Sequence, residues 1–283
     1  MKSKFVGQAI LILLTFIWGT TFPVMKIIVE NIGFAYYVFL RFSIASIILA
    51  PYIFLRYKVK ILFKDTFPGI VLGILFLGGI SFQGLGIEYT SASNAAFITG
   101  LSVVFVYLIE VAIGGEKVSI QLLLAIILSI IGLYLLSFKD MFTPCIGDLI
   151  VLIGSFFWAF QIISVGRYSK KFDLSRLLFF EISSTALGSI SLLSFIKTPS
   201  LNNILDMIPY ILYLSIFCTI FTNMFQLYGQ KLVSNVEAAI IYLMEPVFAY
   251  MLSFIMLGEQ LSIRQFFGAF FIMLAMILSS YKD

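Results

Sequence analysis

The sequence predicts an all-α integral membrane protein with ten transmembrane helices, arranged as two inverted five-helix repeats. Three observations lead to this fold class. Of the 283 residues, 61% are hydrophobic and only 11% are charged, and the mean hydropathy is +1.09. Apolar runs of about 20 residues, enough to cross a bilayer as a helix, follow one another with short loops between them. The second half of the chain also repeats residues of the first half at corresponding positions.

The predicted spans account for most of the chain and leave no room for a soluble domain. The runs are continuous rather than alternating, which argues against a transmembrane β-barrel. Lys2 and Lys4 precede the first run as in a secretion signal, but the run is too long, carries Pro23 and Lys26 near its far end and lacks a small-residue cleavage site, so we interpret it as a retained helix. The ten spans are placed at residues 5–29, 34–55, 67–87, 94–113, 119–138, 146–166, 177–196, 208–230, 236–257 and 263–281.

The basic residues are distributed unequally between the two sides of these spans. Thirteen of the 18 Lys and Arg residues fall on the side of both termini, four fall on the other side, and Arg41 lies within the bilayer. Because loops rich in Lys and Arg stay cytoplasmic, we expect a multi-pass protein of the cell membrane with both termini in the cytoplasm. The net charge of +4 therefore reflects topology, and no nucleic-acid partner is expected.

The internal repeat divides the chain into residues 1–140 and 141–283. The segment from Ser91 aligns without a gap with the segment from Ser234, at a shift of 143 residues. At the same shift Gln83 corresponds to Gln226, and at a shift of 140 residues Trp18 and Arg41 correspond to Trp158 and Glu181. Each half contains five spans, an odd number, so the second half enters the membrane from the opposite side. Secondary transporters built in this way bind their cargo near the midplane between the repeats.

Two charges of opposite sign, Arg41 and Glu181, occupy corresponding places in the second and seventh spans. Intramembrane charges are costly in lipid and tend to face the bundle interior or a water-filled path. Because the repeat is inverted, the two residues are expected near opposite faces of the membrane and need not be partners. Arg41 either reaches the headgroups or clamps backbone carbonyls, or it serves binding or gating. We interpret the pair as gating or structural charges.

Glu245 lies about nine residues into its span, directly before Pro246, whose missing N–H group frees a carbonyl one turn back. A carboxyl group at that depth suits a proton-coupled site or a cationic group of the substrate. The alternative is a protonated or hydrogen-bonded Glu245 that closes the kink.

The remaining candidates for a substrate-binding site are amide and aromatic side chains. An amide offers donors and acceptors to a zwitterionic substrate, but it can also join two helices. Aromatic rings can form the wall of a cavity, or they can simply pack. These substrate-binding candidates are Trp18, Gln83, Trp158, Gln161, Asn223, Gln226 and Tyr242, in addition to Glu245.

Several short motifs resemble those of EamA-type transporters of the drug/metabolite transporter superfamily, and the resemblance covers the whole chain. The motifs are Trp18-Gly19 followed by Phe22, Leu40-Arg41-Phe42, Ser91-Ala92 with Ala95-Ala96, Glu245-Pro246, and Leu257-Gly258-Glu259 followed by Gln265-Phe266-Phe267-Gly268. The resemblance implies a ten-helix inverted repeat that moves small metabolites, often amino acids and frequently outward, through a cavity lined by helices 1, 3, 4, 6, 8 and 9. At Ser102-Val103 the chain lacks a proline equivalent to Pro246, so the fourth helix is expected to be straighter than the ninth.

The expected function is therefore secondary transport, most plainly the export of amino acids or related compounds, with nucleosides, drugs or other amphipathic compounds as the alternative cargo. The chain has no histidine and no phosphate-binding motif, which argues against a membrane enzyme and against ATP-driven pumping. We expect no metal and no cofactor. A channel or scaffold is a further alternative, and the sequence neither requires nor excludes a dimer. The expected partners are a small-molecule substrate and the bilayer, and the sequence leaves open whether transport is coupled to protons or facilitated.

Overall fold

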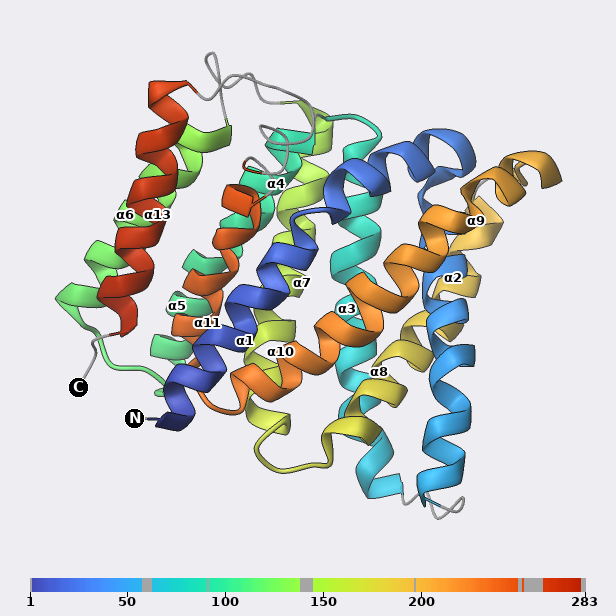
Figure 1. Cartoon of the computed structure of the whole chain (residues 1–283), viewed down its shortest axis with the longest axis horizontal. Helices are drawn as coiled ribbons and strands as arrows, with labels where there is room; N and C mark the ends of the chain where they lie inside the picture. Colours follow the sequence, from blue (N-terminus) through green and yellow to red (C-terminus); the bar gives the residue numbers. More distant parts are fainter. Residues whose placement is uncertain are drawn as a thin grey trace.

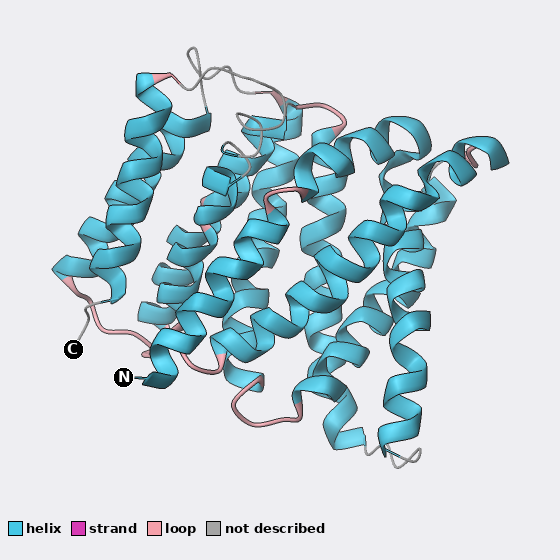
Figure 2. Ribbon diagram, in the orientation of Figure 1, coloured by secondary structure: helices cyan, strands magenta, loops and turns pink. Residues whose placement is uncertain are grey.

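The computed structural model describes residues 2–57, 63–90, 92–137, 145–195, 197–248, 251 and 262–280, and within them every regular element is helical (Figure 2). This confirms the predicted all-α class. The labelled elements of Figure 1 are α1 (Lys2–Trp18), α2 (Thr21–Tyr57), α3 (Phe63–Ile87), α4 (Ala92–Gly100), α5 (Ser102–Ala112), α6 (Ile120–Ser137), α7 (Ile146–Tyr168), α8 (Leu174–Ser189), α9 (Leu201–Ser215), α10 (Thr222–Gln230), α11 (Asn235–Tyr242) and α13 (Ile263–Ser280). A 3₁₀ helix, η1 (Ile190–Phe195), follows α8, and a π-helix, η2 (Ile216–Phe221), joins α9 to α10.

Six stretches of the described residues are long and apolar enough to cross a membrane, which supports the assignment to a multi-pass membrane protein. They are Ser3–Arg56, Thr66–Ile87, Asn94–Ala112, Ile146–Tyr168, Leu174–Ser194 and Leu201–Gln230. The first contains 54 residues, far more than the roughly 20 that one crossing needs. Ile120–Leu135 and Ile263–Ser279 are shorter apolar helices. The total of ten spans stays a prediction.

The first predicted span, 5–29, is divided into two helices. The helix α1 ends at Trp18, and α2 begins at Thr21 after a break at Gly19 and Thr20. Pro23 then lies in the first turn of α2, where its missing N–H group leaves no helical hydrogen bond unmade. Further along, α2 bends at Gly33, whose φ of 75° and ψ of 159° are accessible essentially to glycine alone.

The expected contrast between a straighter fourth span and a broken ninth span is wrong. The fourth span is also interrupted, because α4 ends at Gly100 and α5 begins only at Ser102. At the break the Leu101 N–H donates to the Ile98 carbonyl three residues back, at 3.1 Å. A glycine and a tight 3₁₀-type turn therefore interrupt this helix without a proline. In the ninth span α11 ends at Tyr242.

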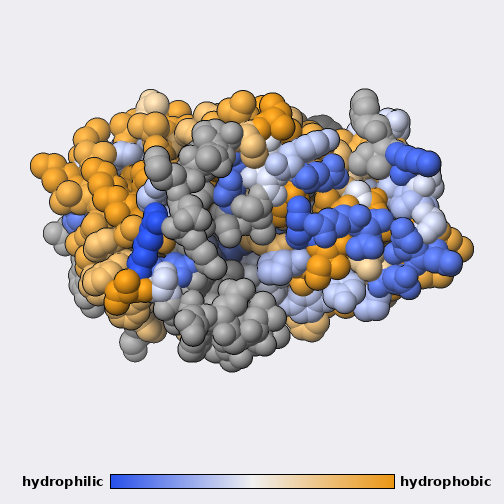
Figure 3. Space-filling view, turned by 90° about the horizontal axis from the view of Figure 1, so that it is seen from above, coloured by the Kyte–Doolittle hydropathy of each residue, from blue (hydrophilic) through white to orange (hydrophobic). Residues whose placement is uncertain are grey.

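The helices form a bundle in which α1 begins and α13 ends at the same edge (Figure 1). We call this the N-terminal edge. At one end of the bundle α6 lies beside α13, and α2 and α9 lie at the other end. Seen from the edge opposite the N-terminal edge, hydrophilic residues gather at the end of the molecule that contains α2 and α9, whereas much of the remaining margin is hydrophobic (Figure 3). Such a hydrophobic margin is expected of a surface that faces lipid.

Glycines let α3 pack closely against the second half of the chain. A Cβ atom added at Gly73 would lie 1.9 Å from Ser184 Oγ in α8, and one added at Gly86 would lie 2.4 Å from Val151 Cγ2 in α7. A Cβ atom this close to its neighbours would clash with them. The absence of a side chain at Gly73 and Gly86 therefore lets α3 pack closely against α8 and α7.

Candidate functional site

A cavity with about 830 Å³ of empty space, part of it open to the outside, lies where the two halves meet. Seven of the eight predicted substrate-binding residues border it: Trp18, Gln83, Trp158, Gln161, Gln226, Tyr242 and Glu245. The exception is Asn223, which is fully buried in α10 and is not among the bordering residues. Of the two gating or structural charges, Arg41 borders the cavity and Glu181 does not. That these residues bind a substrate stays a prediction.

Three helix interruptions border this cavity. Trp18 and Thr21 flank the break between α1 and α2, Gly100 and Ser102 flank the break between α4 and α5, and Leu243 follows the end of α11. Helix ends carry backbone groups without intrahelical partners, so they supply polar atoms inside an otherwise apolar bundle. Broken helices of this kind form the substrate and ion sites of many secondary transporters.

The residues around the cavity occur mostly as corresponding pairs from the two halves of the sequence. Sixteen of the 21 bordering residues form eight such pairs. The pairs at a shift of 140 are Trp18/Trp158, Thr21/Gln161 and Phe22/Ile162, and those at a shift of 143 are Gln83/Gln226, Ala96/Ala239, Thr99/Tyr242, Gly100/Leu243 and Ser102/Glu245. Each half therefore contributes corresponding positions to the cavity, although the side chains at several of them differ.

Arg41 is 2% exposed and is held by a fork of hydrogen bonds. Its Nη2 donates to the Cys218 carbonyl at 2.6 Å, its Nε donates to Thr219 Oγ1 at 2.7 Å, and its Nη1 donates to Tyr37 Oη at 2.5 Å. The π-helix η2 interrupts the regular i→i−4 pattern here, and such π-bulges are frequent at functional sites. The hydrogen bond to the Cys218 carbonyl is a clamp on a backbone carbonyl, one of the three roles considered for Arg41. Because Arg41 also borders the cavity, a binding role is compatible with it.

Glu245 and Arg41 border the same cavity. A guanidinium can bind the carboxylate of a zwitterion, and a carboxyl group can bind its ammonium group. A guanidinium has five N–H donors, and Arg41 uses three of its nitrogens for the fork described above. Two of its N–H groups therefore take no part in this fork.

Glu181 lies behind the cavity wall, in contact with the amide pair Gln161 and Gln226. Gln161 Nε2 donates to Glu181 Oε1 at 2.9 Å and to Gln226 Oε1 at 3.2 Å, and Gln226 Nε2 donates back to Gln161 Oε1 at 3.0 Å. The Glu181 side chain is fully buried, and its Oε2 has no hydrogen-bond partner among the described residues. Arg41 and Glu181 thus have separate hydrogen-bond partners.

Aromatic rings form part of the cavity wall and also pack against one another. The ring centroids of Trp18 and Tyr242 are 5.5 Å apart, and Phe76 meets Trp158 edge to face at 4.7 Å. Trp158 Nε1 has no hydrogen-bond partner within the described part of the chain. Both sequence-based interpretations of these residues, wall and packing, therefore apply together.

Three residues that were not predicted to bind substrate, Thr21, Thr99 and Ser102, also border the cavity. Gln83 Nε2 donates to Thr99 Oγ1 at 3.0 Å, which joins a predicted residue to a missed one. The repeat contained the signal, because these three positions correspond to Gln161, Tyr242 and Glu245 in the second half.

The described residues contain no group of three or more His, Cys, Asp or Glu side chains placed to hold a metal ion. What the cavity offers is one guanidinium, one carboxyl group, several amides and hydroxyls, and aromatic surface. This combination suits reversible binding of a small molecule that carries charged and apolar parts.

Comparisons with known proteins agree with this architecture. A model of the EamA-like transporter family matches residues 5–138 and again residues 145–281. An uncharacterized transporter of Archaeoglobus fulgidus is 31% identical over 272 residues, which cover 96% of this chain and 85% of that protein. The uncharacterized transporter YoaV of Bacillus subtilis is 21% identical over 282 residues, covering 96% and 95% of the two chains.

A solved crystal structure of another protein superposes on this chain with a TM-score of 0.78 and 16% sequence identity. The match covers 98% of this chain and 96% of the other. At that identity the likeness concerns the fold alone. The family match spans almost the whole sequence, and the names of the relatives point to transport rather than catalysis. The chain therefore belongs to the EamA-like transporter family.

Proposed function

We propose that this transporter exports small metabolites, with amino acids or related compounds as the cargo, across the cell membrane by alternating access. In this transporter, residues 1–140 and 141–283 form two inverted five-helix repeats, and both termini lie in the cytoplasm. The single observation that carries it is the cavity between the halves, lined by corresponding residues of each and holding Arg41 and Glu245. A cavity with equivalent walls on two inverted units can open to either side of the membrane by equivalent motions.

The charges around the cavity favour an amino acid as cargo. The two remaining N–H groups of Arg41 can bind a carboxylate, and Glu245 can bind an ammonium group. Gln83, Gln161 and Gln226 offer further donors and acceptors. The aromatic surface around Trp18 and Trp158 then accommodates the apolar side chain of the substrate.

The same aromatic surface favours a second class of cargo, an amphipathic compound such as a nucleoside or a drug. Such a compound stacks its ring system between the aromatic residues and needs only one of the two charges. Competition between unlabelled compounds and a labelled substrate distinguishes the two classes of cargo. A compound that competes at an amino-acid site must carry both a carboxylate and an amine.

The test is uptake and exchange of a panel of labelled amino acids in proteoliposomes, with and without an imposed pH gradient. Saturable flux of one or a few members supports the proposal, and its dependence on the gradient tests proton coupling. If folded protein moves none of them but moves nucleosides or cationic dyes, the amphipathic cargo is correct and the amino-acid assignment is wrong.

A further inference from the structure

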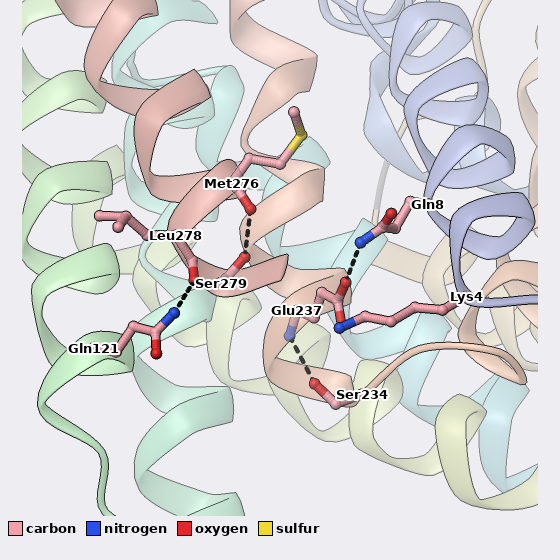
Figure 4. Close-up of polar contacts among 8 residues, drawn as sticks. All are labelled: Lys4, Gln8, Gln121, Ser234, Glu237, Met276, Leu278 and Ser279. Carbon is pink, nitrogen blue, oxygen red and sulfur yellow. Dashed lines mark hydrogen bonds and ion pairs between the residues drawn. The ribbon is translucent and has the colours of Figure 1, made fainter. Parts of the chain in front are cut away.

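Each edge of the molecule has a buried carboxylate that joins the two halves of the chain. At the N-terminal edge Glu237, at the start of α11, accepts a hydrogen bond from Gln8 Nε2 of α1 at 2.5 Å. It also forms an ion pair with Lys4 Nζ at 3.3 Å (Figure 4). At the opposite edge Asp148, at the start of α7, accepts hydrogen bonds from Thr90 Oγ1 at 2.7 Å and from Asn94 Nδ2 at 3.4 Å. Glu237 is 3% exposed and Asp148 is 4% exposed.

These two contacts occupy corresponding places in the repeat. Gln8 corresponds to Asp148 at the shift of 140 residues, and Asn94 corresponds to Glu237 at the shift of 143. At both edges, therefore, the first helix of one half is joined to the fourth span of the other half. We call Lys4, Gln8 and Glu237 the N-terminal latch, and Thr90, Asn94 and Asp148 the opposite latch.

The latches are also placed equally with respect to the cavity. Gln8 and Asp148 each precede by ten residues a tryptophan that borders the cavity, Trp18 or Trp158. At the helical rise this is about 15 Å along the helix. Asn94 and Glu237 each precede by five residues a bordering residue, Thr99 or Tyr242. Each latch thus joins two helices that run from one edge of the molecule to the border of the cavity.

Backbone contacts beside the latches repeat the same symmetry. A Cβ atom added at Gly7 in α1 would lie 3.0 Å from the Gly229 carbonyl oxygen in α10, and one added at Gly147 in α7 would lie 2.7 Å from the Gly86 carbonyl oxygen in α3. Gly7 corresponds to Gly147, and Gly86 to Gly229. At each edge the first helix of one half therefore crosses the third span of the other at a glycine contact, one residue before its latch residue.

Helix capping alone does not explain these carboxylates. In α11 the N-cap residue is Ser234, whose Oγ accepts a hydrogen bond from the Glu237 N–H at 3.2 Å. The Glu237 carboxylate takes no part in this cap and contacts α1 instead. Asp148 Oδ2 accepts the Cys145 N–H at 2.8 Å as part of a capping box, and its other oxygen, Oδ1, binds Thr90 and Asn94. In both cases a carboxylate oxygen is committed to the other half of the chain.

We infer that these latches are the two gates of the transporter, and that the cavity opens to one side of the membrane when the latch on that side breaks. The inference rests on the proposed alternating access and adds the residues that control it. Both latches are formed in this structure while part of the cavity is still open to the outside, so each latch is one of the contacts that close its edge. Removing one of them therefore favours opening toward that edge alone.

Side-specific thiol labelling tests the gates without any substrate. In a background of Cys145→Ser and Cys218→Ala, a reporter cysteine is introduced by Ala239→Cys or, separately, by Ala96→Cys, two positions that border the cavity. A membrane-impermeant maleimide is then added from either side to vesicles of known orientation. Gln8→Leu is expected to raise labelling from the N-terminal edge about five- to tenfold, the bias that one lost hydrogen bond produces, and to leave labelling from the other edge unchanged. Thr90→Val is expected to do the reverse.

Matched controls separate gating from general loosening. Gln121 also joins the two halves, since its Nε2 donates to the Leu278 carbonyl at 2.6 Å (Figure 4), but it lies in α6, away from the cavity border. Gln121→Leu, and Ser279→Ala for the hydroxyl variant, are expected to leave labelling from both sides unchanged. The exchange Gln8→Glu with Glu237→Gln keeps a carboxylate–amide pair and is expected to return labelling to the background rate.

The inference is overturned if Gln8→Leu and Thr90→Val, in protein that elutes as a folded species, change labelling equally from both sides or not at all. Failure of the amino-acid panel would leave this result intact, because the labelling needs no cargo. The two claims can therefore fail separately.

Discussion

Arg41→Lys tests whether the fork of hydrogen bonds around Arg41 anchors η2 to α2. The guanidinium reaches the Cys218 carbonyl, Thr219 Oγ1 and Tyr37 Oη from three different nitrogens. A lysine ammonium is a single nitrogen and cannot span three acceptors arranged around a planar fork. We expect one hydrogen bond to survive, and the loss of two bonds from a charged donor costs about 3 kcal/mol, at about 1.5 kcal/mol each. For a chain of this size that lowers the unfolding midpoint by about 6 to 12 °C.

The assay is thermal unfolding of the purified protein in detergent, followed by intrinsic tryptophan fluorescence. The control is Arg167→Lys, because the Arg167 side chain is 49% exposed and lies 3.5 Å from Glu110. A partly exposed ion pair contributes at most about 1 kcal/mol, so the control should change the midpoint little. If the two variants unfold within about 2 °C of each other, a shift small on the scale expected for this loss, Arg41 does not anchor η2.

Three further changes test other parts of the account. Glu245→Gln is expected to remove the response of flux to a pH gradient; a variant with unchanged rate and pH dependence would show that Glu245 carries no proton. Gly73→Ala is expected to destabilise by about 1 to 3 kcal/mol, because its Cβ would lie 1.9 Å from Ser184 Oγ. Gly84→Ala, whose nearest neighbour is 3.3 Å away, should cost clearly less in the same thermal melt, and equal losses would contradict the packing argument. Gln161→Leu removes the amide that donates to the fully buried Glu181 and is expected to cost about 2 kcal/mol, whereas Gln121→Leu serves as its control in the melt. A midpoint equal to that of the control would show that Glu181 does not depend on this amide.

The sequence predicted the helical membrane fold because continuous apolar runs leave few alternatives in lipid. It also identified most of the polar residues around the cavity, because intramembrane polar groups are rare enough to be considered one by one. Trp18, Gln161 and Glu245 are three of the predicted residues that border the cavity.

The remaining features depend on packing that spacing alone does not reveal. Asn223 and Gln226 lie less than one turn apart in α10, yet only Gln226 borders the cavity. The π-helix that positions the Cys218 carbonyl for Arg41 has no simple sequence signal, and neither does the interruption at Leu101. In each case side chains from other helices decide the local geometry, and the repeat is the sequence feature from which the missed Thr21 and Thr99 could have been found.

Countertransport tests the central claim, alternating access through the cavity between the halves, most directly. Proteoliposomes are loaded with a labelled amino acid that the panel identifies, and its efflux is measured with and without the same unlabelled amino acid outside. A carrier is expected to show saturable efflux that external substrate accelerates, because the loaded cavity returns faster than the empty one. Efflux that rises linearly with concentration and does not respond to external substrate would contradict the account and indicate a channel.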